Sequence, residues 1–247
     1  MKILVLLAFI IFLAFEGKSQ YILLGDADYI ENGCIKLTND RPYSEGIAYH
    51  SSKLNLESYF QIEFDIYLGD KDEYGADGIT FVIHNDPREF QAFGTYGECM
   101  GYGRWNVNYL AGNYIAPSIA IEFDTYFNPS QNDPTGDHVA YLENGTNFHT
   151  AFWNNNNEAF NLEDDRLHSF RLVWDPTQLL LEVYLDQYKV YEGKKDLINQ
   201  IFKGNTSVIW GFTASTGRKY NLQYFCLKRI AVRQLNGIQK LALNQSR

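Results

Sequence analysis

Alternating apolar and polar residues over 57–69 constrain the fold more than any other feature of this chain. The segment reads ESYFQIEFDIYLG, and Phe60, Ile62, Phe64 and Ile66 share one parity. Residues two apart on a strand point to the same face, so the segment predicts a strand with one buried face. Further candidate strands lie at 47–50, 77–84, 118–124, 168–174, 179–188, 207–213 and 221–232.

The spacing of these candidates predicts an all-β fold. Turn residues separate them at intervals of roughly 10 to 15 residues, and Gln187-Tyr188 is expected to begin one such turn. No long amphipathic helix intervenes, and Asp196–Phe202 is the one plausible helical turn. We therefore expect one β-sandwich domain of antiparallel sheets over 21–234, with a lead-in at 21–34 that holds one strand.

The two ends of the chain differ from this domain. Residues 1–20 are typical of a secretory signal peptide, because Lys2 precedes an apolar run at 3–15 that is too short to span a bilayer. We expect cleavage near Gln20 and a secreted, periplasmic or cell-surface location. Residues 235–247 are expected to form a polar tail. The formal net charge of −9, without a basic cluster, argues against nucleic acid and anionic membranes as partners.

Three cysteines, Cys34, Cys99 and Cys226, allow three pairings. One disulfide and one spare thiol is the simplest arrangement in an exported protein. We favour the Cys34–Cys226 pairing, since the first and last strands of a closed sandwich commonly lie side by side. Cys99 lies in a glycine-rich loop and is expected to be unpaired.

The segment 118–141 carries the strongest chemical signal. It begins as a strand on which Glu122, Asp124 and Tyr126 point to one face, and Asn128 follows at the same parity. A loop rich in turn residues then carries Asp133, Asp137 and His138. Carboxylates on one face repel each other unless a cation lies between them. Oxygen ligands suit calcium, and an added imidazole suits a transition ion such as manganese.

The sequence IEFDTYFNPSQNDPTGDH resembles the metal loop of legume-type (L-type) lectins, and the resemblance extends over residues 30–232. The chain looks like the variety found in secreted bacterial proteins. The resemblance implies a concanavalin-like jelly-roll sandwich. It also implies that Glu122, Asp124, Asp133 and His138 hold a transition ion, usually manganese. Calcium would be held by Asp124, the Tyr126 carbonyl, Asn128 and Asp133.

The same resemblance implies a saccharide site beside the metals. Asp77, after a cis peptide bond, would accept hydrogen bonds from sugar hydroxyls, and an amide near Gly97 or Glu98 would donate one. The Asn128 side chain would serve both calcium and sugar, and Tyr126 would stack on the sugar ring. The segment 215–220, including Ser215 and Thr216, would set sugar preference.

Two positions depart from the family pattern. Glycines are sparser than usual around Gly97, which leaves the amide donor uncertain by one residue. Arg218 and Lys219 stand where smaller residues are common. They would either favour an acidic sugar or be solvated, and we prefer the second interpretation.

We therefore predict a secreted, metal-dependent carbohydrate-binding domain that is not an enzyme. A homodimer that pairs through the flat sheet is a possible assembly. Two other function classes stay open. Bacterial β-glucanases of the sandwich type carry Glu-x-Asp-x-x-Glu on one strand, but Phe127 occupies the third position here. A structural or adhesion module that has lost sugar binding is the other alternative, although Asp77 and Asn128 argue against it.

Overall fold

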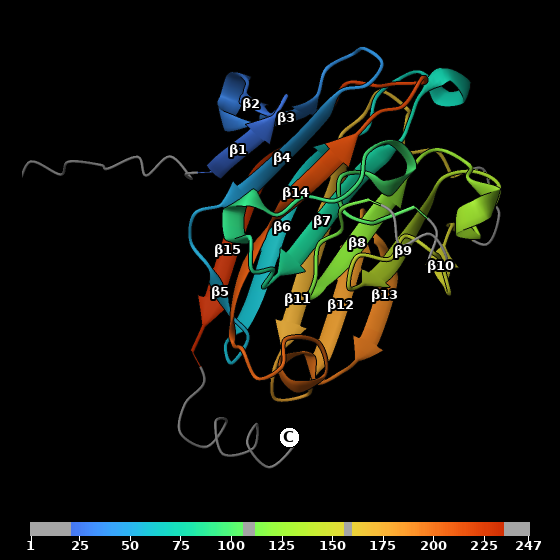
Figure 1. Ribbon diagram of the computed structural model, residues 1–247. Coiled ribbons are helices and arrows are strands. Elements are labelled where there is room, and N and C mark those ends of the chain that lie inside the picture. Colours follow the sequence, from blue (N-terminus) through green and yellow to red (C-terminus); the bar gives the residue numbers. More distant parts are fainter. Residues whose placement is uncertain (1–20, 106–111, 156–159, 235–247) are drawn as a thin grey trace, which may run out of the picture.

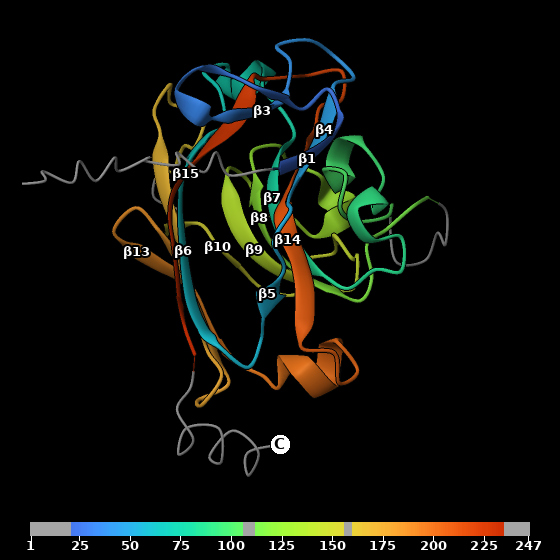
Figure 2. The same ribbon diagram turned by 90° about the vertical axis from the view of Figure 1, so that its left-hand side faces the viewer.

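The computed structural model describes residues 21–105, 112–155 and 160–234 (Figure 1). The expected signal peptide at 1–20 and the expected tail at 235–247 lie outside these residues and stay predictions. Two antiparallel sheets lie face to face, and Figure 2 shows them edge-on. The expected all-β sandwich is confirmed.

The first sheet, here called the front sheet, carries the strand on which the metal signal was found. β8 lies between β7 and β9 in this sheet. In spatial order, its strands are β1 (Tyr21–Gly25), β4 (Glu45–His50), β14 (Ser207–Ser215), β7 (Gly78–His84), β8 (Ser118–Asp124), β9 (His138–Glu143) and β10 (Phe152–Trp153), and β5 (Leu54–Asn55) pairs with one end of β14.

The second sheet, here called the back sheet, is built around the segment with the clearest alternation. In spatial order, its strands are β13 (Tyr188–Lys194), β12 (Leu180–Leu185), β11 (His168–Asp175), β6 (Tyr59–Tyr67), β15 (Gln223–Arg233), β3 (Ile35–Thr38) and β2 (Asp28–Tyr29).

The main core lies between the two sheets. The four alternating residues of β6 are all buried, as their parity predicts. Aromatic rings from both sheets meet there, and Phe64 of β6 lies edge-on to Phe212 of β14 with ring centroids 4.7 Å apart. Such contacts add to the burial of apolar area, which is the main term that stabilises a sandwich.

A second, smaller core covers the outer face of the front sheet. Tyr49, Val82 and Ala120 from the sheet pack there against Tyr102 and Ile115 from the long segment between β7 and β8. This segment, which carries η3 (Glu89–Gln91) and η4 (Gly97–Cys99), lies outside the front sheet in Figure 2. Both faces of β7 and β8 are therefore buried. Polar residues on the outer face of β8 are consequently withdrawn from water.

Two local expectations need correction, and a third is confirmed. Tyr188 does not begin a turn but begins β13, because the hairpin turn is complete at residues 186–187. The lead-in 21–34 holds two strands, β1 and β2, which join different sheets. The predicted helical turn is confirmed as η7 (Leu197–Ile201). Within the described residues, the remaining short helices are η1 (Glu31–Gly33), η2 (Asp72–Tyr74) and η5 (Pro129–Gln131).

The disulfide joins Cys34 and Cys226, as predicted. Cys34 directly precedes β3, which pairs with β15, so the pairing brings an early and a late strand of the back sheet together. Cys99 is unpaired and buried. Across the described ranges, we find no helix with the length and apolar character that a bilayer crossing requires.

Candidate functional site

The end of β8 positions the candidate metal ligands. Asp124 is the last residue of β8 and lies in register with Gly78 of β7 and His138 of β9. Glu122 and Asp124 share the outer face of the strand, as their parity predicts, because Ile121 and Phe123 belong to the core between the sheets. The carboxylates therefore lie beneath the segment that covers the front sheet, where solvent exposure is 1% and 2%.

Tertiary structure brings three of the predicted transition-ion ligands together with one residue that was not predicted. One ligand atom each from Asp124, Asp133, His138 and His149 lies within 4.8 Å of all the others. His138 Nε2 is 3.7 Å from Asp124 Oδ2 and 4.0 Å from Asp133 Oδ1. All four side chains are almost completely buried.

Hydrogen bonds close the loop that carries these residues. The Tyr126 amide donates to Asp124 Oδ1 at 2.8 Å, and the Asn128 amide donates to Asp133 Oδ2 at 2.6 Å. Each carboxylate thus keeps its other oxygen directed toward the cluster. Tyr126 and Asn128 lie half-buried on this loop, as expected of neighbouring calcium ligands, and their role stays a prediction.

The electrostatics of the cluster favour a cation. Burial, together with the neighbouring charges of Glu122 and Asp133, raises the pKa of Asp124 well above its ordinary value. Burial also lowers the pKa of His138 to about 4, so that its imidazole is neutral and able to ligate. Burying several carboxylates without a counter-charge costs several kcal/mol. Carboxylate oxygens and the neutral imidazole of His138 in one buried cluster fit a divalent ion.

Glu122 lies outside this four-residue set. Its Oε2 is 2.6 Å from Nε2 of His149, a residue on the segment between β9 and β10. Burial lowers the pKa of His149, but Glu122 and Asp133 outweigh burial and raise it to about 10. Sequence reasoning missed His149 because it follows His138 by 11 positions in an irregular segment, where no periodic pattern marks it.

Asp77 lies beside this cluster and directly precedes β7. The Ala76–Asp77 peptide bond is cis, as the resemblance implied. Oδ2 of Asp77 is buried and has no hydrogen-bond partner among the described residues. Burial, with a contribution from Glu98, raises the pKa of the Asp77 carboxyl to about 7. A buried carboxylate oxygen without a partner is a ready acceptor for a ligand hydroxyl, because leaving it unsatisfied costs free energy.

A hollow of about 240 Å³ opens next to Asp77. The predicted residues Gly97, Glu98 and Thr216 line it, and Gly217 stands between it and the Asp77 carboxylate. Gly97 has a φ of +63°, and a Cβ built there would meet nothing within 4 Å, so its backbone faces open space. Tyr43, Ser44, Glu45, Tyr96 and Trp105 complete the lining.

The hydroxyl groups of Ser215 and Thr216 are engaged inside the protein. Ser215 Oγ donates to the Gly97 carbonyl at 3.1 Å, and Thr216 Oγ1 accepts from the Ser44 amide at 2.9 Å. Both side chains are buried. They join β14 to the loops around the hollow, and their predicted sugar contacts stay predictions.

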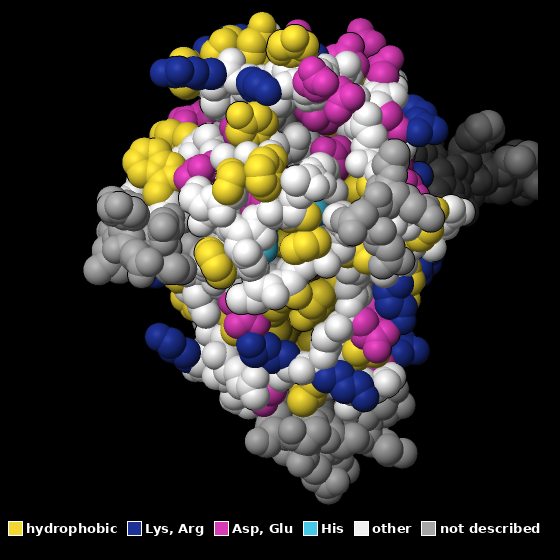
Figure 3. All heavy atoms as spheres, turned by 90° about the vertical axis from the view of Figure 1, so that its right-hand side faces the viewer, with side chains coloured by type: hydrophobic (Ala, Val, Ile, Leu, Met, Phe, Trp, Pro, Cys, Tyr) yellow, Lys and Arg dark blue, Asp and Glu magenta, His cyan; other side chains and the backbone are white. Residues whose placement is uncertain are grey.

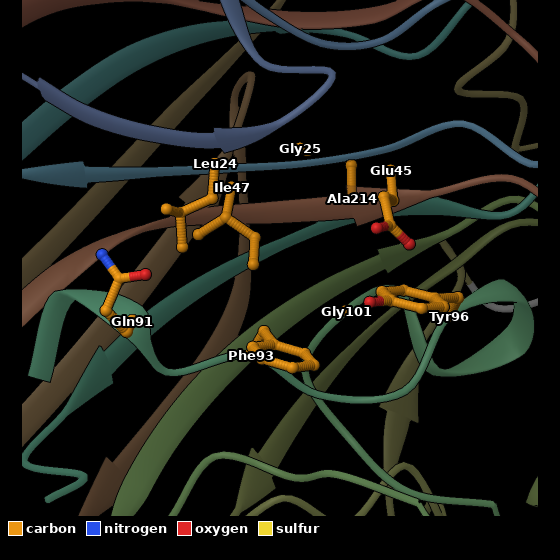
Figure 4. Close-up of a pocket in the computed structure, with 10 residues that line it drawn as sticks. Leu24, Gly25, Glu45, Ile47, Gln91, Phe93, Tyr96, Gly101 and Ala214 are labelled. Carbon is orange, nitrogen blue, oxygen red and sulfur yellow. The ribbon is translucent and has the colours of Figure 1, made fainter. Parts of the chain in front are cut away.

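A second hollow of about 210 Å³ adjoins the first, since Glu45 and Tyr96 line both. In Figure 4, Phe93 and Tyr96 form one side and Leu24 and Ile47 the other. The rings of Phe93 and Tyr96 are nearly parallel, with an interplanar angle of 5°. Aromatic faces of this kind suit the C–H face of a pyranose ring.

The two cations near the site have different environments. Arg218 is exposed, which fits the preferred interpretation that it is solvated. Lys219 is not simply solvated, because its ammonium donates to the Glu73 carbonyl and lies 5.1 Å from the ring centre of Tyr126.

Acidic side chains gather at the upper end of the face shown in Figure 3, toward the end of the molecule where Figure 1 places η2.

Comparisons with known proteins agree with this geometry. The profile described as the legume lectin beta-barrel domain matches residues 14–229. A galactose-binding lectin of Arachis hypogaea is 30% identical over 149 residues, covering 56% of this chain and 52% of that protein. A putative L-type lectin-domain containing receptor kinase of Arabidopsis thaliana is 24% identical, covering 85% of this chain and 36% of that protein. The chain thus spans about half or less of the length of these relatives.

Solved lectin structures share the fold. Lectin I-B4 of Griffonia simplicifolia, in a metal-free form, superposes with a TM-score of 0.69 at 22% identity, covering 90% of this chain and 96% of that one. The Bauhinia forficata lectin in complex with GalNAc also has a TM-score of 0.69, at 18% identity and the same coverage. The expected jelly-roll sandwich is confirmed. The extent of the profile match and the shared sandwich together show that this chain belongs to the legume-type (L-type) lectin family.

Proposed function

We propose that the chain is a secreted, metal-dependent carbohydrate-binding domain whose saccharide site is the hollow beside Asp77. The observation that carries the proposal is the buried carboxylate oxygen of Asp77, which lacks a partner within the described part of the chain. A Cβ built at Gly217 would lie 3.5 Å from this oxygen, and Gly217 lines a hollow whose other walls include the aromatic rings of Tyr43, Tyr96 and Trp105. An acceptor beside aromatic faces is the combination that a pyranose with adjacent hydroxyls requires.

In this proposal, Asp77 accepts hydrogen bonds from two hydroxyl groups of the saccharide. The backbone amides near Gly97 and Glu98 are the complementary donors, since both residues line the hollow. The Asn128 side chain and the ring of Tyr126 add contacts at the side of the metal loop. We expect a neutral saccharide, because Asp77, Glu45 and Glu98 surround the hollow with acidic groups.

The metal-binding loop would act by positioning and not by touching the sugar. Divalent ions held by Asp124, Asp133, His138 and their neighbours would neutralise the buried carboxylates and fix the loop. Calcium and a transition ion such as manganese are the expected pair. The peptide group after Asp124 is hydrogen-bonded to Asp77, so order in the loop is transmitted to the acceptor.

The second hollow gives this site room for more than one sugar unit. Because Glu45 and Tyr96 line both hollows, a saccharide bound at Asp77 can extend past them toward Phe93. Individual affinities are expected to be weak, so several copies acting together would raise the apparent affinity. Pairing of two copies through a flat sheet stays a prediction.

A glycan array tests the proposal. The mature domain, loaded with calcium and manganese, is compared with the same protein in EDTA and with Asp77→Ala. Galactose and GalNAc are the first probes, since the related lectins of Arachis hypogaea and Bauhinia forficata are described with these sugars. Metal-dependent binding that Asp77→Ala abolishes supports the proposal. Glycan binding that is unchanged both in EDTA and in Asp77→Ala would contradict it. Release of sugar from β-glucans would favour a hydrolase.

A further inference from the structure

His149 is one of the four residues of the buried cluster, with Asp124, Asp133 and His138. Its Nδ1 atom is 2.8 Å from Asp133 Oδ1 and 3.2 Å from His138 Nε2. The side chain is 1% exposed, and the two imidazole rings meet edge to face with centroids 4.8 Å apart. Nδ1 therefore points at the same small volume as the ligand atoms of Asp124, Asp133 and His138.

The other nitrogen of His149 has a different partner. Nε2 lies 2.6 Å from Glu122 Oε2, and Glu122 is itself 1% exposed. An imidazole that ligates a metal through one nitrogen almost always donates its other N–H to a carboxylate or carbonyl group. Glu122 and His149 have this arrangement, with the carboxylate on the far side of the ring from the cluster.

We propose that His149 is a direct ligand of the transition ion through Nδ1, and that Glu122 is the positioning residue that holds its ring. The ligand set is then Asp124, Asp133, His138 and His149, with two nitrogen and two oxygen donors. This differs from the set that the sequence resemblance implied, in which Glu122 is a ligand and His149 has no role. The inference uses the metal site of the proposed function, but it concerns ion choice and not saccharide binding.

The second imidazole changes which ion the site prefers. Carboxylates and water suit manganese and magnesium, whereas imidazole suits zinc, copper, iron and nickel, and affinity for a given site generally rises from manganese through cobalt toward zinc. Four protein ligands of this kind also satisfy the tetrahedral preference of zinc. We therefore expect this site to bind Zn²⁺ or Co²⁺ more tightly than Mn²⁺, while the adjacent oxygen ligands of Tyr126 and Asn128 suit calcium.

Metal titration tests the assignment without any saccharide. The chelator-treated full domain, with calcium present, is titrated with Zn²⁺, Co²⁺ and Mn²⁺ by calorimetry. The wild type should bind one Zn²⁺ at least tenfold more tightly than Mn²⁺. His149→Gln should lose roughly 100-fold in zinc affinity and most of the preference, and it should weaken the visible absorption of the Co²⁺ form. His168→Gln, a buried histidine of the back sheet, is the matched control and should leave all three affinities unchanged.

Glu122→Gln separates the two roles and remains informative if His149→Gln does not fold. If Glu122 is a positioning residue, Glu122→Gln should lower the zinc affinity roughly 10- to 100-fold and leave the binding stoichiometry and the Co²⁺ spectrum unchanged. Loss of the site in Glu122→Gln, or equal zinc affinity in wild type and His149→Gln, would overturn the proposal. The proposal would also be overturned if the wild type bound no transition ion and His149→Gln bound one. In that case His149 would itself supply the positive charge that balances the carboxylates. If the protein bound no glycan, the proposed function would fail, but the metal titrations would still test the ligand assignment.

Discussion

The main-chain carbonyl oxygen of Asp77 accepts a hydrogen bond from the Thr125 amide at 3.0 Å and lies 3.3 Å from the Thr125 hydroxyl. Thr125 directly follows Asp124, which is both the end of β8 and a member of the metal cluster. The candidate sugar acceptor and the candidate metal ligands are thus joined by a backbone contact. Any change that releases the metal loop should disturb the saccharide site.

Removal of the Asp77 carboxylate should strongly weaken saccharide binding and leave the fold intact. A hydrogen bond to a charged group contributes about 1.5–3 kcal/mol, which corresponds to roughly a 10- to 150-fold loss of affinity for Asp77→Ala. The melting temperature should hardly change, because the substitution removes a buried group whose Oδ2 lacks a partner within the described residues. Calorimetric titration of the sugar identified on the array measures the loss. The surface variant Asp28→Ala should bind normally, and a normal Asp77→Ala would disprove the site.

Removal of metal should weaken saccharide binding and stability together. Ions at 100 times their dissociation constant stabilise the folded state by about 2.7 kcal/mol. For a domain of this size, EDTA should therefore lower the melting temperature by roughly 5–10 °C. Asp124→Ala should lack this shift and bind sugar poorly, whereas Asp77→Ala should keep the full shift. An EDTA-insensitive melting temperature in the wild type would refute the coupling.

Phe93 should contribute to the binding of longer saccharides only. It lines the second hollow and not the one beside Asp77. Phe93→Ala removes a stacking surface worth about 1 kcal/mol, so the affinity for a trisaccharide should fall about fivefold while that for its terminal monosaccharide stays constant. Titration of both ligands measures the difference. An equal loss for both would show that the two hollows do not act as separate subsites.

His168 should stabilise the protein more at acidic than at alkaline pH. Its Nδ1 is 2.9 Å from Asp186 Oδ2 and its Nε2 is 3.2 Å from Asp164 Oδ1. Burial lowers the pKa of His168, but these carboxylates outweigh burial and raise it. A folded-state pKa above the unfolded value gives stability that is present below the unfolded pKa and is lost as pH rises through the folded one. His168→Gln should therefore cost about 1 kcal/mol more at pH 5.5 than at pH 8.5 in urea unfolding.

His50 provides a control of opposite sign for that measurement. Its ring stacks on Trp210 at 4.4 Å, and burial lowers its pKa, with the Ser52 carbonyl opposing the shift in part. Stability from neutral His50 is lost as pH falls, so His50→Gln should cost less at pH 5.5 than at pH 8.5. The same pH trend in both variants would show that the effect does not come from these imidazoles.

The disulfide should stabilise the domain through a long covalent loop. Cys34 and Cys226 are separated by 192 positions, and their cross-link restricts the unfolded chain strongly. Replacing both by serine should lower the free energy of unfolding by about 2–4 kcal/mol. Urea unfolding with and without reductant measures this, and reductant should not affect the double variant. An unchanged midpoint for the reduced wild type would contradict the expectation.

Local sequence patterns were sufficient to predict the sandwich and much of the metal loop. The period of two in β6 and β8 is a property of each strand alone, so it predicts which side chains face the core without knowledge of any partner. The spacing of Glu122, Asp124, Asp133 and His138 lies within a single strand and loop, and three of the four converge as expected. The sequence did not predict β13, because apolar and polar residues alternate only weakly along this exposed strand. Lys189 and Glu192, for example, both face solvent.

Only the tertiary structure decided the role of His149 and the burial of the site. The contact between His149 and Glu122 joins residues 27 positions apart, and that between Asp77 and Thr125 joins residues 48 apart. Neither follows from a local period, since each depends on how loops return to the sheet. Likewise, the burial of Glu122 and Asp124 arises because the segment before β8 folds over the outer face of the front sheet. A strand determines the direction in which its side chains point, but the surrounding chain determines what those side chains meet.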